Sequence, residues 1–188
     1  AFQAPNLVYA RQEPQLGTGH AVQQAVPQLH DDGTTLILNG DVPLIRPATA
    51  AALAAASGGT KLALLTIELA DATGYGRIVR EHGRVTRIVE KPKPEDAPST
   101  LAVVGRYILT PRIFHHLENV KPGAGGEIQL TDGIASLLSE EQVLAYRYDG
   151  TRYDCGSKLG YLQATVVFGQ RHPEVGPAFD AYLKSLGG

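Results

Sequence analysis

The chain has 188 residues, with 17 lysines and arginines, 19 aspartates and glutamates, and a formal charge of −2. This length predicts a single domain over residues 1–188, and the 43% hydrophobic content is typical of a globular chain with a buried core. The scattered, balanced charge excludes a basic face for nucleic acid or for an anionic membrane. No apolar run reaches the roughly 18–20 residues of a membrane span. A single cysteine, Cys155, excludes an internal disulfide framework, and we expect a cytoplasmic protein without a signal peptide.

The first part of the chain predicts strands that alternate with helices. Short apolar stretches predict strands at residues 6–9, 34–38 and 61–69, and the run at 34–38 has the continuous apolar character of an interior strand. Helices are predicted at residues 20–26 and 47–57, the second with a proline at its start and two glycines after its end. This alternation predicts a mostly parallel α/β sheet.

The second part of the chain begins with a predicted β-hairpin, because polar and apolar residues alternate at 75–80 and 84–90 around a Glu-His-Gly turn. A proline-rich stretch at 91–99 then predicts an extended loop. The remaining predicted elements are strands at 101–109 and 143–148 and helices at 111–117, 131–139, 158–170 and 175–186. The apolar face of the last helix predicts packing on the chain's own core or on a second subunit of a homo-oligomer.

Asp41 is the sharpest single candidate for a functional residue. It follows the predicted strand 34–38 directly, within Asn39-Gly40-Asp41. Ligands of open α/β sheets bind beyond the carboxyl ends of the strands, and a carboxylate beside a glycine suits Mg²⁺ held between protein and phosphate oxygens. The alternative is an aspartate that only caps the turn before Pro43.

A second candidate lies just before the first helix, where Gln12 and Gln15 precede Gly17-Thr18-Gly19. Two side-chain amides and a flexible loop provide donors and acceptors for the edge of a nucleobase. The alternative is an ordinary turn in which Thr18 caps the helix.

Glu90 and Lys91 end the predicted hairpin and form a third candidate. The carboxylate can accept hydrogen bonds from sugar hydroxyls, and the neighbouring ammonium can bind a phosphate. Gly76, in Gly74-Tyr75-Gly76, would allow a ligand to approach the backbone closely. The alternatives are a solvated charge pair at 90–91 and a tight turn at 74–76.

Asp154 lies between the last predicted strand and a helix, in Asp154-Cys155-Gly156. This second carboxylate could meet Asp41 across a metal ion, or it could cap the helix. Cys155 lacks a recognisable histidine partner and is interpreted as a packing residue.

Taken together, these residues resemble the bacterial sugar-1-phosphate uridylyltransferases, which belong to the sugar-1-phosphate nucleotidyltransferases. Residues 1–90 resemble the N-acetylglucosamine-1-phosphate type, through the strings at 15–21, 39–44 and 73–78. Residues 88–188 are similar to the UTP–glucose-1-phosphate type, through the strings at 89–93, 123–132 and 154–161. The two halves would join near residues 88–93, which predicts a possible composite chain within one domain.

The resemblance implies a Rossmann-like nucleotide-diphospho-sugar transferase fold with a mostly parallel mixed sheet, and transfer of UMP from UTP to a hexose 1-phosphate. It implies that Mg²⁺ is the cofactor, that UTP and a sugar 1-phosphate are the partners, and that Lys91 contacts the sugar-side phosphate during catalysis. The implied nucleotide site contains Gln12, Gln15, Gly17, Thr18 and Gly40, the sugar site Gly76, Glu90, Val103 and Val104, and the metal site Asp41 and Asp154.

Two departures from the family pattern leave alternatives open. The family's opening glycine-rich loop, with its first strand and its arginine and lysine, has no counterpart in residues 1–188, so we expect weak product binding with little turnover from this stretch alone. Val103 and Val104 are the glucose-type residues, whereas the first half favours N-acetylglucosamine. A non-catalytic scaffold that at most binds a UDP-sugar is the rival interpretation. A dinucleotide-binding protein is disfavoured because its Gly-x-Gly-x-x-Gly opening is missing.

Overall fold

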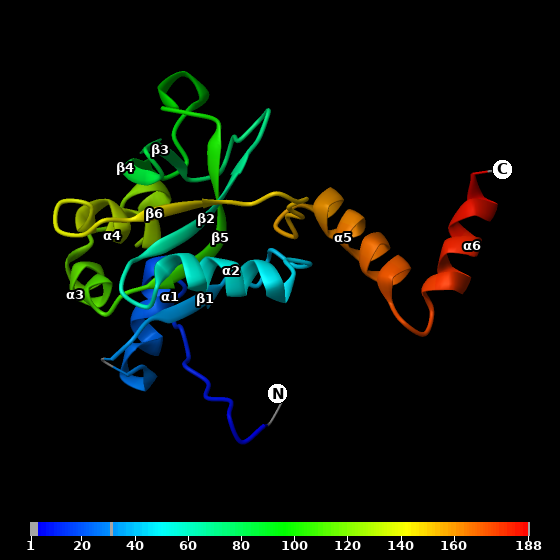
Figure 1. The fold of residues 1–188 in the computed structure, drawn as a ribbon, viewed down its shortest axis with the longest axis horizontal. Coiled ribbons are helices and arrows are strands. Elements are labelled where there is room, and N and C mark those ends of the chain that lie inside the picture. Colours follow the sequence, from blue (N-terminus) through cyan, green and yellow to red (C-terminus); the bar gives the residue numbers. More distant parts are fainter. Residues whose placement is uncertain (1–3, 31, 188) are drawn as a thin grey trace.

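The computed structural model describes residues 4–30 and 32–187, which fold into a mixed sheet with helices on both faces and a helical arm at the C-terminal end (Figure 1). The strands are β1 (Thr35–Leu38), β2 (Ala63–Glu68), β3 (Arg77–Glu81), β4 (Arg84–Val89), β5 (Leu101–Leu109) and β6 (Leu144–Arg147). The helices are α1 (Thr18–Ala25), α2 (Pro47–Ser57), α3 (Arg112–Asn119), α4 (Leu130–Leu137), α5 (Lys158–Arg171) and α6 (Gly176–Leu186). Short 3₁₀ turns cover Val26–Gln28, Pro94–Asp96 and Ala124–Gly126.

The sheet has the order β1-β5-β2-β6-β4-β3 in the described residues, with a further pairing of β5 to β3. The predicted mixed α/β character is confirmed, but the expectation that the sheet is mostly parallel is wrong for this part of the chain. Only β2 and β6 pair in parallel, whereas the other adjacent strands pair antiparallel. The reason is β5, which runs against both β1 and β2 and lies between them. β1, β2 and β6 therefore point the same way, as the alternation predicted, although β1 and β2 are not neighbours.

The segment at residues 6–9 was predicted to be a strand, and this prediction is wrong in the structure. Residues 7–10 have no regular secondary structure, and Val8 is 68% exposed. The described residues assign no sheet pairing to the segment, and a strand exists only through its ladder. β1 is also less buried than predicted, since Leu36 and Leu38 are exposed on one of its faces.

The core lies on both faces of β5, which is buried along its whole length. Because successive strand residues point to opposite faces, Val103 and Tyr107 pack with α1, α3 and α4, whereas Val104 and Ile108 pack with Leu53 of α2. β5 is therefore the interior strand whose two faces are both covered by helices, whereas β1, which was predicted to be interior, lies at the end of the strand order of the described residues.

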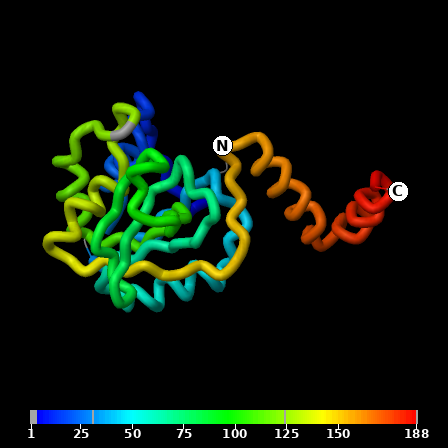
Figure 2. Tube along the Cα trace, turned by 90° about the horizontal axis from the view of Figure 1, so that it is seen from above, coloured from blue at the N-terminus to red at the C-terminus, as the bar shows by residue number. Residues whose placement is uncertain are grey.

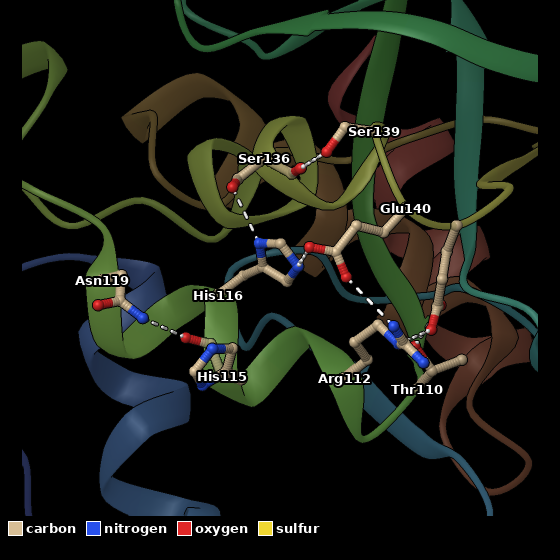
Figure 3. A network of polar contacts seen from close by, with 9 residues as sticks. Thr110, Arg112, His115, His116, Asn119, Ser136, Ser139 and Glu140 are labelled. Atoms are coloured by element: carbon tan, nitrogen blue, oxygen red, sulfur yellow. Dashed lines mark hydrogen bonds and ion pairs between the residues drawn. The ribbon is translucent and has the colours of Figure 1, made fainter.

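A polar network joins α3 to the end of α4 (Figure 3). His116 lies between the two elements, with Nδ1 2.9 Å from Ser136 Oγ and Nε2 3.4 Å from Glu140 Oε1. Arg112 contacts Glu140 at 3.2 Å and Glu141 at 2.9 Å. The Arg112 side chain is 58% exposed, so its ion pairs are screened by solvent and contribute little to stability. The network fixes the relative position of two helices that cover one face of the sheet.

Helices α5 and α6 form an arm that extends away from the sheet in both views (Figures 1 and 2). The two helices pack on each other where Gly169 meets Phe179, and a Cβ at Gly169 would lie 2.7 Å from the Phe179 ring. Large apolar side chains of the arm nevertheless remain exposed, among them Leu159, Leu162, Phe168, Tyr182 and Leu186. None of the helices in the described residues is both long and apolar enough to cross a membrane.

Candidate active site

A cavity of about 860 Å³ opens where the turns after β1, β4 and β6 meet the turn before β3. Its wall contains all but one of the residues proposed from the sequence: Gln12, Gln15, Gly17, Thr18, Gly40, Asp41, Gly76, Glu90, Lys91, Val103 and Asp154. These residues are spread over 143 positions of the chain between Gln12 and Asp154, so the fold has brought them together.

Val104 is the exception, and its proposed place in the sugar site is wrong. Val104 is fully buried on the face of β5 that packs against α2. Val103 lies on the opposite face and lines the cavity. Consecutive residues of a strand point to opposite faces, so Val103 and Val104 cannot both line the cavity.

One end of the cavity is formed by the loop before α1. Gln12 Nε2 donates to the Gly17 carbonyl at 2.9 Å, which holds the glutamine side chain against the loop. Gly17 itself has a φ of +112°, and a Cβ there would lie 2.6 Å from the Ile128 carbonyl oxygen, so only glycine fits. The loop is therefore a fixed, glycine-dependent surface beside the cavity.

Thr18 connects this loop to the segment that leads into α4. Its Oγ1 donates to Gln129 Oε1 at 3.0 Å and accepts from the Leu130 N–H at 3.0 Å. The side chain makes no capping bond to α1, contrary to the alternative in which Thr18 caps that helix. Gln129 is 2% exposed and also donates to Glu127 Oε2 at 2.5 Å. A polar network thus supports the wall behind Thr18.

Glu90 and Lys91 form the other end of the cavity. The Glu90 side chain is only 11% exposed, and its Oε2 accepts a 2.7 Å hydrogen bond from Thr131 Oγ1. Lys91 Nζ lies 3.8 Å from Glu90 Oε1, and Lys91 has a positive φ of 39°, which is uncommon for a residue other than glycine. Burial raises the pKa of Glu90, although the Thr131 hydroxyl and the Lys91 ammonium oppose this shift. The alternative of a merely solvated charge pair does not describe a carboxylate this deeply buried.

Gly76 forms the floor between these groups. A Cβ at this position would lie 3.0 Å from Glu90 Oε2, 3.3 Å from Thr131 Cγ2 and 3.5 Å from Val103 Cγ2. Any side chain at residue 76 would therefore displace the carboxylate or fill the cavity. The structure shows that protein side chains approach the Gly76 backbone closely, and the predicted approach of a ligand stays a prediction.

Asp41 and Asp154 come together near Gly156 in the wall of the cavity. A Cβ at Gly156 would lie 3.0 Å from Asp154 Oδ1 and 4.0 Å from Asp41 Oδ2. The Cys155 N–H donates to the Asp41 carbonyl at 2.8 Å and ties the two turns together. Two carboxylates, each on a turn after a strand that points the same way, therefore lie on one side of the cavity, as predicted.

The carboxylate of Asp154 is strongly hydrogen-bonded. Its Oδ1 accepts from the Gly156 N–H at 2.9 Å, whereas Oδ2 accepts from the Tyr75 hydroxyl and lies 3.2 Å from Nη1 of Arg152. Burial alone would raise the pKa of Asp154, but these donors together hold it below its usual value. Asp154 is therefore ionised throughout the neutral range.

Arg106 holds the turn that carries Asp41. The guanidinium is almost fully buried and donates to the carbonyls of Asn39 at 2.8 Å, Gly105 at 2.9 Å and Val42. Burial lowers the pKa of Arg106, while the nearby Asp41 carboxylate counteracts this effect. A buried cation that bonds both sides of the turn fixes the position from which Asp41 reaches the cavity.

Residues 2–170 match the nucleotidyl transferase family. The chain belongs to this family. It is 38% identical over 191 residues to a UTP–glucose-1-phosphate uridylyltransferase of Staphylococcus epidermidis, covering 96% of this chain and 66% of that protein. It is 36% identical over 195 residues to UTP–glucose-1-phosphate uridylyltransferase 2 of Streptococcus pyogenes, covering 97% and 65%. The chain thus spans slightly less than two thirds of the length of these curated relatives.

Solved structures give the same result for this nucleotidyl transferase chain. A UDP-glucose pyrophosphorylase complexed with UDP-glucose superposes with a TM-score of 0.81 at 34% identity, covering 88% of this chain and 66% of that one. The UTP-bound enzyme from Acinetobacter baumannii gives 0.74 at 34% identity, covering 91% and 62%. The predicted nucleotidyltransferase fold and the resemblance to the glucose-type uridylyltransferases are confirmed. The N-acetylglucosamine-type resemblance of the first half and a junction near residues 88–93 stay predictions.

Several cavity residues of the nucleotidyl transferase chain were not proposed from the sequence, and Tyr75, Thr131 and Arg152 are three of them that contact proposed residues directly. For Arg152 a signal was present, because it precedes Asp154 by two residues in an extended segment, and such residues share a face. Tyr75 lies inside the string Gly74-Tyr75-Gly76 but was not assigned a role. Thr131 reaches Glu90 only through tertiary packing across 41 positions, and no local pattern indicates this contact.

Proposed function

We propose that this chain carries the active site of a Mg²⁺-dependent uridylyltransferase that converts UTP and glucose 1-phosphate into UDP-glucose and pyrophosphate. The observation that carries the proposal is that the Asp41–Asp154 pair, the Thr18 loop and Glu90 line one cavity. A nucleotide sugar has parts that match these groups: a base, two phosphates that attract a cation, and a sugar with hydroxyl groups. The glucose-type relatives support the same substrate pair.

The uracil end of the substrate would lie against the loop before α1. Gln12 and Gln15 supply side-chain amides there, and Gly17 and Gly40 leave the backbone open to a flat ring. Thr18 and Gln129 hold the loop against the segment before α4, so the base would meet a fixed surface. Hydrogen bonds to the uracil edge would select the nucleotide.

The carboxylates of Asp41 and Asp154 fit a magnesium ion that is shared with phosphate. No group of three or more histidine, cysteine, aspartate or glutamate residues among the described residues could hold a metal by itself. Magnesium typically takes one or two carboxylates and completes its coordination with water and substrate phosphates, which suits this pair. When bound, the ion would neutralise phosphate charge at the reacting phosphorus.

The sugar end would lie between Gly76, Glu90 and Val103. Glu90 can accept hydrogen bonds from sugar hydroxyls with the oxygen that Thr131 leaves free, and the Gly76 backbone allows close approach. Val103 presents a methyl surface without a donor for an acetamido group, which favours glucose over N-acetylglucosamine. Lys91 would bind the sugar-side phosphate as a point charge.

In the reaction, an oxygen of glucose 1-phosphate attacks the α-phosphorus of UTP. A new phosphorus–oxygen bond forms, the bond between the α-phosphorus and the bridging oxygen breaks, and pyrophosphate leaves with that electron pair. The attacking oxygen is already anionic, so no side chain has to remove a proton. The residues of the cavity bind and orient the two substrates and neutralise phosphate charge. Positioning and charge neutralisation account for most of the rate of phosphoryl transfer.

Binding of UDP-glucose in the presence of Mg²⁺ is the first test. We expect wild-type protein to bind UDP-glucose more tightly than UDP-N-acetylglucosamine, measured by calorimetry. Asp41→Asn should weaken this binding, while Asp149→Asn, an exposed carboxylate outside the cavity, should leave it unchanged. A protein that binds neither nucleotide sugar would refute both the enzyme and the rival binding scaffold.

Pyrophosphate release separates these two functions. An enzyme should release pyrophosphate from UTP and glucose 1-phosphate, and Lys91→Ala should slow the release with any sugar 1-phosphate. Binding without release would favour the scaffold. The expectation that residues 1–188 alone show little turnover stays a prediction, and a rate of about 1–10³ s⁻¹ from this polypeptide would refute it.

We also propose that two copies associate through the arm formed by α5 and α6. The support is the set of large apolar side chains that this arm exposes, since solvent contact of such a surface is unfavourable. Sedimentation analysis should show a dimer, and Leu162→Glu with Phe168→Glu should produce the monomer.

A cytoplasmic location is part of the proposal, because the described cysteine, Cys155, is a free thiol.

A further inference from the structure

Arg152 is a buried cation in the wall of the cavity. The proposed function does not yet assign it a role. Its side chain is 8% exposed and lines the cavity beside Asp154. Nη1 lies 3.2 Å from Asp154 Oδ2, and the guanidinium lies 4.3 Å from the centroid of the Tyr75 ring. Contacts on two sides hold the charge in one place.

The protein does not satisfy this guanidinium completely. The Nε of Arg152 is buried and has no hydrogen-bond partner in the described residues. An unpartnered donor on a buried charged group is costly and calls for an explanation. The guanidinium pairs with Asp154 through Nη1 alone and lines the cavity, so its remaining donor group has hydrogen-bonding capacity for a ligand.

The two oxygens of Asp154 divide their contacts in a way that accommodates both a metal ion and Arg152. Oδ2 contacts Arg152 and Tyr75, whereas Oδ1 is the oxygen that lies near the position shared with Asp41. A metal ion at Oδ1 would not have to displace the arginine from Oδ2. The two carboxylates would offset the divalent charge, so the charge of Arg152 would remain for an anionic ligand to balance.

The other basic groups near the cavity are committed elsewhere. Arg106 donates to three backbone carbonyls of the Asp41 turn and its neighbour on β5. Arg11 pairs with Glu13, and both side chains are mostly exposed. Lys91 lies at the Glu90 end. Arg152 is thus the cation beside Asp154 that also lines the cavity.

We propose that Arg152 binds the phosphates of the nucleotide substrate directly and is a catalytic residue of the uridylyltransferase, with Tyr75 as the positioning residue that holds its guanidinium. The inference rests on the proposed function, since it assigns the phosphates to the part of the cavity beside Asp154. A rigid, water-poor guanidinium at this place would stabilise negative charge on the phosphoryl group as it is transferred. It supplies the cation that the sequence analysis did not find in residues 1–188.

The test measures binding of UDP-glucose, UMP and uridine to wild type, Arg152→Gln, Arg152→Lys and Tyr75→Phe, each with Mg²⁺ and with EDTA. Arg152→Gln should weaken UDP-glucose binding by about 10- to 100-fold in both conditions, because a hydrogen bond to a charged group is lost. Uridine, which has no phosphate, should bind equally to both proteins. Arg152→Lys keeps the charge but loses the planar guanidinium with its several donors. Its affinity for UDP-glucose should lie between those of wild type and Arg152→Gln.

The EDTA measurements distinguish phosphate binding from mere support of Asp154. If Arg152 acted only by orienting the metal ligand, its replacement would have no effect in EDTA, and that result would overturn the proposal. Loss of all wild-type UDP-glucose binding in EDTA would overturn it as well. Tyr75→Phe keeps the ring under the guanidinium and should retain the affinity measured in EDTA.

Two controls keep the interpretation unambiguous. Arg147→Gln changes an exposed arginine outside the cavity and should leave every affinity unchanged. Melting temperatures check that each variant folds. If Arg152→Gln does not fold, the binding measurements on Arg152→Lys still test the proposal. Failure of wild type to bind UDP-glucose with Mg²⁺ would refute the proposed function itself, whereas tight wild-type binding with an unaffected Arg152→Gln variant would refute only this inference.

Discussion

Replacement of Thr131 by valine tests the burial of Glu90, the most deeply buried carboxylate of the cavity. The change keeps the shape of the side chain and removes the 2.7 Å hydrogen bond to Glu90 Oε2. The Glu90 side chain is 11% exposed, so little water can replace the lost donor. Hydrogen bonds to charged groups are worth about 1.5–3 kcal/mol, and for a chain of this size that corresponds to a melting-temperature decrease of roughly 3–12 °C.

The pH dependence makes this prediction specific. Burial raises the pKa of Glu90 in the folded state above its unfolded value, so folding becomes more favourable as the pH falls through the raised pKa towards the ordinary glutamate value. The Thr131 hydroxyl opposes this rise, and Thr131→Val should therefore raise the pKa further. The stability deficit of the variant should be largest at neutral pH and should shrink at acidic pH, where Glu90 is protonated in both proteins.

Denaturant unfolding at pH 7.5 and at about pH 5, followed by circular dichroism, measures both effects. Thr131→Ser keeps the hydroxyl and is the matched control, which should recover most of the pH-dependent part of the loss. A deficit that is equal at the two pH values would show that Thr131 contributes packing alone. Unchanged stability at pH 7.5 would refute the conclusion that Glu90 is ionised and dependent on this donor.

The remaining predictions concern Glu90 itself, Gly160, and the neighbours Val103 and Val104. UDP-glucose affinity should fall at acidic pH as Glu90, whose pKa is raised, becomes protonated, and Glu90→Gln should bind weakly at all pH values without that titration. Gly160→Ala places a Cβ 2.0 Å from the Asp154 carbonyl oxygen, so it should destabilise the fold by about 1–3 kcal/mol and weaken Mg²⁺-dependent binding in calorimetry. Val104→Ala should lower the free energy of unfolding by about 1–3 kcal/mol without changing UDP-glucose affinity, whereas Val103→Ala should change both.

Most of the fold could be predicted from local pattern, because each helix and strand carries its own periodicity and breakers. The α2 helix, for example, has the predicted bounds Pro47–Ser57, with proline at its start and Gly58 in the left-handed conformation after its end. Strand order could not be obtained in the same way. The position of β5 between β1 and β2 depends on which strands find each other in space, and the apolar run of β5 is the same whether its neighbours are parallel or antiparallel.

The site was more predictable than the sheet, and the reason is physical. Residues such as Asp41 and Asp154 follow strands that point the same way, so their turns meet at one edge whatever the exact strand order. Val104 was misplaced because the string Val103-Val104 was treated as one unit, although a strand separates its two side chains. Thr131 could not be found, since its contact with Glu90 depends on how α4 packs near β4.

The buried charges around the cavity explain how the site remains organised before any ligand enters. Arg106 holds the Asp41 turn through backbone carbonyls, and Arg152 holds Asp154 through Oδ2. Each acidic turn thus has its own buried guanidinium, and arginine suits this role because its fork can bond several oxygens while the charge stays fixed. Two carboxylates close to each other would otherwise repel and move apart, which would spoil a shared site for a divalent ion. The two arginines nevertheless differ in one respect. The contacts of Arg106 are to the backbone of the turn it holds and to its own strand, whereas Arg152 lines the cavity, and so Arg152 is the one of the pair that can meet a ligand.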